Sequence, residues 1–589
     1  MIKYLICFFL LPSGLLAQPK YFEKSFNWYP TTTANQNGIK IFEDNNRQYV
    51  IGGLINSYNP SIWNTCTVIV DNTGTLIDTN EYHIDTTLFN GVNMYDMLPT
   101  EYGYIMVGFI SFADSTMANV YVVRLSHDGI LIDQHYYPCL YYVDDIFNYQ
   151  SFINIGYSIS RTPDNGYLIG GYAQSPIDVL YYPYLCKLNA NLQLEWDTLY
   201  EQYANIESKI RLLKPAANGN GYYAVLNINT TYSEGDIAVL RIDDNGTILE
   251  EHIYGESTDK KELVSGFIET LDNEYAITFY QIPNTGPRYC GLLKTDQING
   301  IEWANNTMYY NGGLDGGVIQ LPDSSFIVSG GYVKQVEPYD VDIELNKFSN
   351  SGQWLWTRHY GNEGNDYIYD MIVDSQGSLV FCGRDEAVNL PDVINGANVY
   401  LLKTNCMGLL TQPQASFTAT MDSAALTASF QNLSQFVYPD SIDGGHYIWD
   451  FGDGNTSTQA NPTHTYAQGG NYTVTLTAVV CSDTSVFVQE VSTWAVGIDA
   501  SPQPPPKEGE MQNLFSITPN PATNQAVAHL PPLLCANSGR LQLLSVTGKL
   551  LQSIPYAAKQ QTVAFSVAHL PAGIYFVQVG NAVQKLVVE

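Results

Sequence analysis

The segment Y-V-I-G-G at residues 49–53 decides the fold, because close variants of it recur through the first two thirds of the chain. Each variant is an apolar stretch of five residues, and most of them end in a small residue. The other copies read Y-I-M-V-G, Y-L-I-G-G, Y-Y-A-V-L, Y-A-I-T-F, F-I-V-S-G and L-V-F-C-G, and they begin at residues 104, 167, 222, 275, 326 and 379. Neighbouring starts are therefore 51 to 63 residues apart, which indicates seven copies of one unit.

Each unit has the pattern of about four strands and shows no helical periodicity. After the apolar stretch come a variable loop, a second strand, a turn and a last strand rich in Trp and Tyr. Four-stranded units of this length, repeated seven times, predict a seven-bladed β-propeller at residues 18–411. The glycine pairs indicate positions where neighbouring sheets approach closely. In six units the second strand ends in a basic residue, and these residues are Arg124, Lys187, Arg241, Lys294, Lys347 and Lys403.

The seventh unit lacks its own Trp/Tyr strand. An unassigned stretch with that composition, Y-F-E-K-S-F-N-W-Y at 21–29, precedes the first unit. We therefore predict that residues 21–29 pair into the seventh blade and close the ring. Such closure removes an open sheet edge, which would otherwise favour aggregation.

Residues 412–497 differ in character from the repeats. They contain W-D-F-G-D-G-N-T-S-T at 449–458 and G-N-Y-T-V-T-L-T-A at 470–478. These motifs resemble the polycystic-kidney-disease (PKD) domain, and the resemblance implies an immunoglobulin-like β-sandwich. We interpret Asp450, Asp453 and Asn455 as residues that shape the Gly-rich turn, with a calcium cluster as the alternative.

A Pro-rich linker at 498–513 precedes the last segment, 514–589. That segment resembles the C-terminal sorting domain of the bacterial type IX secretion system, which implies a small β-sandwich that engages the secretion machinery. The predicted fold class is thus all-β: a seven-bladed propeller followed by two small β-sandwich domains. Three motifs carry the resemblance, L-F-S-I-T-P-N-P-A-T-N at 514–524, L-Q-L-L-S-V-T-G-K-L-L at 541–551 and L-P-A-G-I-Y-F-V-Q-V at 570–579.

The N-terminus predicts export. Residues 1–17 combine Lys3, a short apolar run and a small residue at Ala17, which is typical of a signal peptide. No other stretch reaches 18 apolar residues, so we expect no transmembrane span. We expect a secreted protein that is extracellular or attached to the outer-membrane surface. The net charge of −32 repels phosphate backbones and argues against a nucleic-acid partner.

Cysteines are sparse for an exported chain of 589 residues. Removal of residues 1–17 leaves eight of the nine, without a C-x-x-C motif, so disulfides are permitted but not required. Cys382 and Cys406 fall within one repeat and form the first candidate pair.

Motifs for chemistry are absent from the sequence. Neither H-E-x-x-H nor G-x-S-x-G occurs, and the residues indicate no metal or cofactor. A glycosidase-like pair of carboxylates stays open, because acidic residues are plentiful and the sequence alone singles out no pair. The loops between second and third strands emerge on one face of a propeller, where function concentrates. Their aromatic residues are candidate ligand contacts, although packing is the alternative in a chain with 44 tyrosines. The candidates are Tyr58, Trp63, Phe112, Tyr181, Tyr182, Tyr184, Tyr232, Tyr332 and Tyr339.

These observations favour a monomeric binding or adhesion protein that recognises an extracellular glycan or protein through one propeller face. The PKD-like domain would serve as a spacer. The alternative is a secreted hydrolase or lyase that acts on polysaccharide or glycoprotein at the propeller channel, since propellers also host such chemistry.

Overall fold

The computed structural model divides into two compact units, residues 1–495 and 496–589. The signal peptide predicted at 1–17 and the linker predicted at 498–513 lie outside the described residues. The structure describes residues 20–588 except 27–34, 59–60, 85–86, 114–116, 145–147, 152, 176–178, 206–207, 231–232, 256–259, 284–287, 297–299, 311–316, 335–339, 363, 387–396, 423, 438–444, 494–514, 533–534, 546–549 and 580–581.

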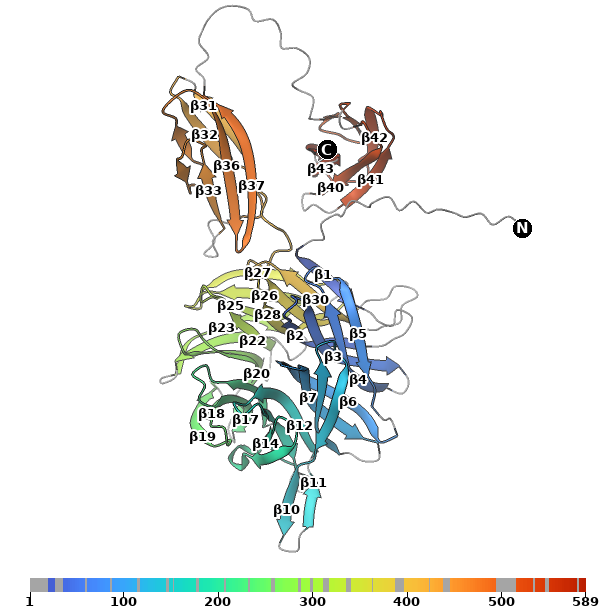
Figure 1. Ribbon diagram of the computed structural model, residues 1–589, viewed down its shortest axis with the longest axis vertical. Coiled ribbons are helices and arrows are strands. Elements are labelled where there is room, and N and C mark those ends of the chain that lie inside the picture. The colour runs from blue at the N-terminus through green and yellow to red at the C-terminus, as the bar shows by residue number, and fades with distance from the viewer. Residues whose placement is uncertain are drawn as a thin grey trace, which may run out of the picture. The chain divides into compact units, whose positions relative to one another are not determined.

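Seven antiparallel sheets of four strands form the propeller in the described part of the chain (Figure 1). We number them as blades 1 to 7. Blades 1 to 6 are each built from four consecutive strands. Blades 1 and 2 are β2 (Asn35–Glu43), β3 (Tyr49–Tyr58), β4 (Ser61–Val70) and β5 (Leu76–Tyr82), then β6 (Phe89–Thr100), β7 (Gly103–Phe112), β8 (Ala118–Ser126) and β9 (Leu131–Tyr137). Blades 3 and 4 are β12 (Ile153–Arg161), β13 (Tyr167–Gln174), β14 (Tyr181–Leu188) and β15 (Leu194–Leu199), then β16 (Lys209–Pro215), β17 (Tyr222–Thr230), β18 (Ser233–Ile242) and β19 (Ile248–Tyr254). Blades 5 and 6 are β20 (Lys260–Glu269), β21 (Tyr275–Pro283), β22 (Arg288–Asp296) and β23 (Gly300–Tyr310), then β24 (Val318–Gln320), β25 (Phe326–Val333), β26 (Val341–Phe348) and β27 (Trp354–Tyr360).

Blade 7 combines the two ends of the repeat region. Its strands are β28 (Asp366–Val373), β29 (Leu379–Glu386), β30 (Ala397–Thr404) and β1 (Phe22–Phe26). β1 runs antiparallel to β30, with Phe22 opposite Lys403 and Phe26 opposite Val399. Phe22 is buried with residues of blades 1 and 7, so the N-terminal strand contributes to the core as well as to the ladder.

One connection departs from the regular repeat. The hairpin β10 (Leu140–Asp144) and β11 (Asn148–Ser151) is inserted between blades 2 and 3 and projects from the ring (Figure 1). This insertion accounts for the widest spacing between repeats in the sequence. The 3-10 turn η1 (Glu201–Tyr203) follows blade 3.

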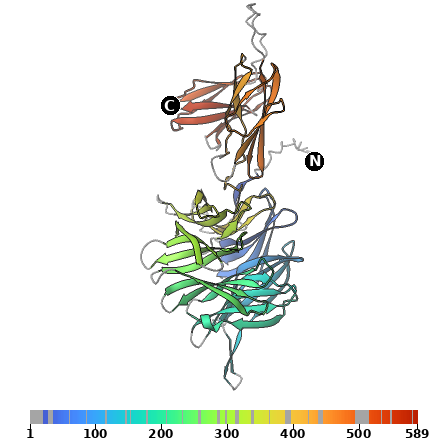
Figure 2. The ribbon, with the colours of Figure 1, turned by 90° about the vertical axis from the view of Figure 1, so that its left-hand side faces the viewer.

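The core lies between blades, which lie side by side in both views (Figure 1, Figure 2). The two middle strands of each blade face a neighbour on both sides, so they read as almost continuous apolar runs. One cluster, for example, joins Val107 and Val122 of blade 2 to Ile169 and Cys186 of blade 3. Burial of apolar surface from two directions stabilises the ring at about 25 cal/mol per Å².

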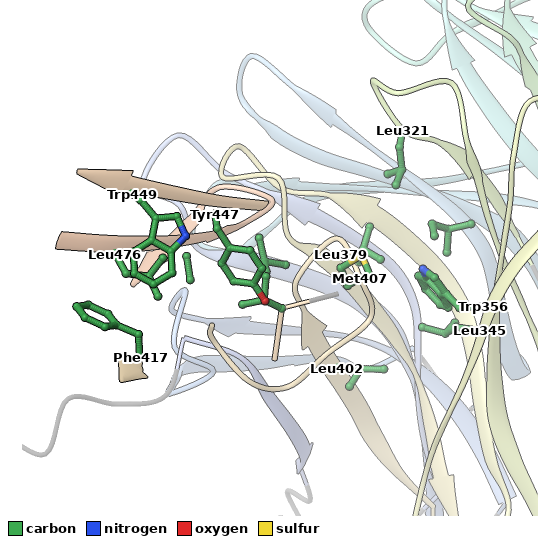
Figure 3. Packing of buried hydrophobic residues seen from close by; sticks show 14 of the residues in the cluster. Leu321, Leu345, Trp356, Leu379, Leu402, Met407, Phe417, Tyr447, Trp449 and Leu476 are labelled. Atoms are coloured by element: carbon green, nitrogen blue, oxygen red, sulfur yellow. The ribbon is translucent and has the colours of Figure 1, made fainter. Parts of the chain in front are cut away.

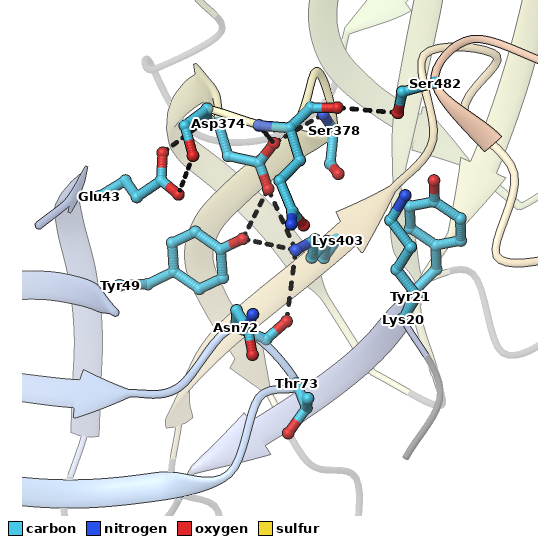
Figure 4. Close-up of polar contacts among 12 residues, drawn as sticks. Lys20, Tyr21, Glu43, Tyr49, Asn72, Thr73, Asp374, Ser378, Lys403 and Ser482 are labelled. Atoms are coloured by element: carbon cyan, nitrogen blue, oxygen red, sulfur yellow. Dashed lines mark hydrogen bonds and ion pairs between the residues drawn. The ribbon is translucent and has the colours of Figure 1, made fainter. Parts of the chain in front are cut away.

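The repeated basic residue forms ion pairs within its own blade. It lies near the end of the third strand, where it neutralises acidic side chains of the preceding turn or of the last strand. Lys403 is the most buried case: its Nζ lies 3.0 Å from Asp374 and 2.7 Å from the Tyr49 hydroxyl (Figure 4). The other pairs are Arg124–Asp133, Lys187–Glu195, Arg241–Glu250, Lys294–Asp272 and Lys347–Asp323.

The repeated tyrosine at the end of the last strand fastens one blade to the next. The Tyr137 hydroxyl donates to the Leu192 carbonyl, and the Tyr200 hydroxyl donates to the Gly246 carbonyl, each at 2.7 Å. Tyr82 donates in the same way to Gly129, and Tyr360 to Gly408. Much of the tyrosine content is therefore structural.

Residues 411–493 form two facing sheets, as the PKD resemblance implies. One sheet contains β31 (Phe417–Asp422), β32 (Thr427–Asn432) and β35 (Thr463–Thr465), and the other contains β34 (Thr456–Ser457), β33 (His446–Asp450), β36 (Asn471–Val480) and β37 (Asp483–Ser492). Trp449 is fully buried at their centre. The same buried cluster continues through Met407 into blades 6 and 7 (Figure 3).

The disulfide prediction was wrong. Cys406 pairs with Cys481 of the PKD-like domain, while Cys382 is a free thiol buried between blades 7 and 1. Ser482 and Asp483, next to this disulfide, bind the Gln376 carbonyl and the Tyr21 hydroxyl respectively. The PKD-like domain thus touches both chain ends of blade 7.

Residues 515–588 form a separate pair of sheets. These are β38 (Ser516–Thr518), β39 (Gln525–His529) and β42 (Thr562–Ser566), and β41 (Leu550–Tyr556), β40 (Gly539–Leu544), β43 (Gly573–Val579) and β44 (Ala582–Val588). They enclose their own apolar core, in which Cys535 is buried. Across all the described residues, the structure contains no helix long and apolar enough to span a membrane.

Candidate functional site

The innermost strands carry a repeated irregularity that shapes the central channel. Six of the seven contain a register shift opposite the apolar repeat segment, so that one residue has no partner on the second strand. Such bulges redirect a side chain away from the sheet. The unpaired residues are Ile39, Tyr95, Tyr157, Arg211, Ser265 and Tyr369.

The second glycine of the repeat motif is required by the inner strand of its own blade, and not by a neighbouring blade as the sequence predicts. A Cβ on Gly108 would lie 1.8 Å from the Asn93 carbonyl oxygen, and one on Gly171 would lie 1.8 Å from that of Ile155. These carbonyls belong to the inner strand of the same blade, just before the bulge. The first glycine fits the original expectation, since a Cβ on Gly170 would meet Ile210 of the next blade at 2.7 Å.

All six unpaired residues line one cavity of about 480 Å³ at the centre of the ring. Leu54 and Trp63 of blade 1 and Phe267 of blade 5 add apolar surface to it. Its charged lining residues are Lys40, Asp96, Arg211, Lys214 and Asp370, which come from four different blades. A concave, largely apolar site with a few polar groups is the usual form of a small-ligand site.

Lys40 lies between two aspartates in this cavity. Its Nζ is 3.2 Å from Asp370 Oδ1 and 3.5 Å from Asp96 Oδ1, and both carboxylates also accept backbone N–H groups. Burial disfavours the charged amine, but Asp370 and Asp96 outweigh that effect and raise the pKa of Lys40. The group links the neighbouring blades 7, 1 and 2 at the channel.

Asp96 also fixes blade 3. Its Oδ2 accepts the Ser158 hydroxyl at 2.7 Å and the Ile159 N–H at 3.0 Å. The Ser158 Oγ in turn accepts the Leu213 N–H of blade 4 at 3.1 Å. Because the Asp96 carboxylate is buried and already holds several donors, it suits positioning better than proton transfer.

A line of tyrosines leads from the cavity toward the outside. The rings of Tyr95 and Tyr157 are 4.5 Å apart, and those of Tyr157 and Tyr172 are 5.9 Å apart. Tyr172 lies 4.8 Å from Tyr181, which starts the third strand of blade 3. Arg211 stacks over Tyr157 at 4.7 Å, and burial raises the pKa of that tyrosine.

The loop aromatics predicted as contacts do not form one patch. Trp63 lines the cavity and Tyr181 continues the tyrosine line. Phe112 packs against Phe89 at 5.3 Å, and Tyr332 lies 4.4 Å from His359.

Two further candidates lie inside the structure. Tyr184 is fully buried in β14, and its hydroxyl donates to Asp197 at 3.0 Å, so it is a core residue rather than a ligand contact. Tyr182 is partly buried against the same core. Tyr232, Tyr339 and the side chain of Tyr58 lie outside the described residues.

The Gly-rich turn of the PKD-like domain is held by its own polar groups. The Gly452 N–H donates to Asp450 at 2.9 Å, the Asn455 N–H donates to Asp453 at 3.0 Å, and His464 pairs with Asp453 at 2.7 Å. These contacts match the turn-forming interpretation. In the described segments, no group of three or more His, Cys, Asp or Glu side chains has an arrangement that holds a metal ion.

Comparison with known families identifies the two smaller domains. A model described as PKD domain matches residues 411–492, and one described as secretion system C-terminal sorting domain matches residues 516–589. The chain is therefore a propeller protein with a PKD domain and a type IX sorting domain, and the sorting domain indicates that it is secreted or held at the cell surface.

Curated relatives match over short stretches. The chain is 68% identical over 31 residues to the collagenase ColA of Bacillus cereus and 53% identical over 47 residues to the pre-pro-metalloprotease PrtV of Vibrio cholerae. These matches cover 5% and 8% of this chain but only 3% and 5% of those proteins.

Solved structures resemble the separate parts. The PKD1 domain of the Vibrio cholerae metalloprotease PrtV aligns over 14% of this chain and 100% of its own, with 34% identity and a TM-score of 0.13. The β-propeller domain of the Trilobed protease from Pyrococcus furiosus aligns over 65% of this chain and 96% of its own, with 10% identity and a TM-score of 0.32.

Proposed function

We propose that this exported protein binds a glycan in the central cavity of its propeller. The observation that carries the proposal is the 480 Å³ cavity, which combines aromatic rings with charged groups from several blades. A sugar presents apolar C–H faces and many hydroxyls, so it matches rings such as Trp63, Tyr95 and Tyr157 beside polar neighbours.

The PKD domain serves as a spacer in this proposal. It is joined to blade 7 by the Cys406–Cys481 disulfide and by a shared apolar cluster. This attachment supports a spacer that is fixed firmly to the propeller.

A glycan array with the mature chain tests the proposal. Tyr157→Ala removes the ring at the centre of the tyrosine line, and we expect it to weaken binding about tenfold or more, because such rings dominate binding surfaces. Trp354→Ala is the matched control, since Trp354 is 54% exposed on β27 and remote from the cavity lining.

Three outcomes would count against glycan binding in the cavity: no bound glycan, unchanged binding by Tyr157→Ala, or equal loss in both variants. Thermal melts show whether each variant is folded. Release of shorter oligosaccharides during incubation would instead support the secreted hydrolase or lyase.

A further inference from the structure

Lys214 differs from the other buried lysines of the propeller. Lys294, Lys347 and Lys403 each have a carboxylate oxygen within 3.1 Å, and Lys40 has two aspartates. Among the residues that the structure describes, the Lys214 side chain has no hydrogen bond or ion pair, although the residue is half-buried and lines the cavity. Each of these four lysines has its own counter-charge, and Lys214 differs from them in this respect.

The strand register shows that this lysine is particular to one blade. Lys214 lies three residues after the bulge residue of β16. At the same distance from their bulges, the other inner strands place Phe42, Leu98, Ser160, Ile268 and Ile372. Lys214 is the charged member of this set, so the repeat architecture does not require a lysine there.

The surroundings disfavour a bare ammonium group. Burial and the positive charge of Lys40 lower the pKa of Lys214, while Asp96 and Asp370 act in the opposite direction but are engaged by Lys40. A buried charge without a close partner costs free energy. An anionic group on a ligand would supply that partner.

The charge of the cavity points the same way. Its lining contains Lys40, Arg211 and Lys214 against Asp96 and Asp370, which leaves one excess positive charge. The whole chain carries −32, so the cavity is a positive site in an acidic molecule. An anion is thus attracted to the channel more than to the rest of the surface.

We propose that the cavity selects a glycan bearing an anionic group, a carboxylate or a sulfate, and that Lys214 donates a hydrogen bond to that group. This inference rests on the proposed function and specifies its ligand class. Both groups are strong acceptors for an ammonium donor. The sugar rings would meanwhile contact the tyrosines beside Arg211.

The test measures affinities of the mature chain for paired probes. One arm uses uronic-acid oligosaccharides and their methyl esters, and the other uses sulfated oligosaccharides and their desulfated forms. We expect the anionic member of one pair to bind about tenfold or more tightly than the neutral member. Lys214→Gln should abolish this preference, so that the anionic member of each pair binds no more tightly than the neutral member, whereas Lys214→Arg should keep the preference.

Arg161→Gln is the control for a general loss of positive charge, because Arg161 is exposed at the end of β12. Equal binding of both members, with neutral binding still sensitive to Tyr157→Ala, would overturn this inference and leave the proposed function intact. A preference that survives in Lys214→Gln would overturn the role of Lys214. Failure of every probe to bind would overturn both proposals.

Discussion

The frame of the propeller, by which we mean its repeated ion pairs and inter-blade tyrosine bonds, is the same from blade to blade, whereas the residues that line the channel differ. In the frame, the blades agree: a basic residue ends the third strand in six blades, and a tyrosine such as Tyr137 or Tyr200 fastens one blade to the next. At the inner-strand bulge they disagree, with tyrosine, arginine, serine and isoleucine at equivalent places. A symmetric ring needs identical joints, whereas an asymmetric ligand needs different side chains around one cavity.

The largest effect on the free energy of unfolding is expected from a substitution in the frame. Lys403→Met leaves Asp374 buried without its cation, and we expect a loss of about 3–5 kcal/mol in the free energy of unfolding. Arg241→Met alters the equivalent position of blade 4, where the partner Glu250 is 46% exposed, so the expected loss is about 1 kcal/mol or less. Chemical denaturation measures both, and equal losses would contradict the importance we give to buried pairing.

A smaller effect is expected at the start of the innermost strand, at a position where the residue differs from blade to blade. Asn154 of blade 3 donates from Nδ2 to the Tyr137 carbonyl at 2.9 Å, and the equivalent residue of blade 7 is Asp366. Burial raises the pKa of Asp366 to about 8, with Asp385 adding to the shift. The folded protein therefore holds this proton at pH values where the unfolded chain has lost it.

The stability contributed by that proton is present at low pH and is lost as the pH rises from the ordinary carboxyl range through about 8. Asp366→Asn removes this dependence. Between pH 5 and pH 9 we expect the wild type to lose up to about 4 kcal/mol more of its free energy of unfolding than the variant. Parallel pH dependences in the two proteins would show that Asp366 is ionised in the native state.

The smallest effect concerns a single inter-blade hydrogen bond. Tyr137→Phe removes the donor to the Leu192 carbonyl and should cost about 1 kcal/mol, seen as a lower melting temperature. Tyr102→Phe is the control, because Tyr102 is 66% exposed. A melting temperature for Tyr137→Phe equal to that of the control would remove this tyrosine from the frame.

The sequence was sufficient for the fold because the frame repeats. The apolar segments that begin at residues 49, 104 and 167 correspond to β3, β7 and β13, each of them a second strand. It was insufficient for the channel, because a bulge interrupts the alternation of side chains between the two faces of a strand, and that alternation is what predicts which residues line the channel. A usable signal existed: the tripeptide Y-D-M occurs at 95–97 and again at 369–371, at equivalent places in blades 2 and 7.

Two other failures have different causes. The sequence predicts a loop at Tyr184, but β14 begins already at Tyr181 and its pairing buries Tyr184. Cys406 was matched with a cysteine of its own repeat, whereas its partner, Cys481, belongs to the next domain. Sequence spacing carries no information about a contact between domains.

The antiparallel pair of β1 and β30 has a consequence for the order of assembly. Phe22 and Lys403 are 381 positions apart, yet the ends of a flexible segment that long meet at only ~2 kcal/mol more entropic cost than the ends of one repeat, since each doubling of length adds ~0.6 kcal/mol. Thermodynamically, the five-residue strand β1 is therefore sufficient to hold the ring closed. Kinetically, β1 comes first in the chain and must wait for β30, the last strand of the ring, so blades 1 to 6 can form before the circle is complete.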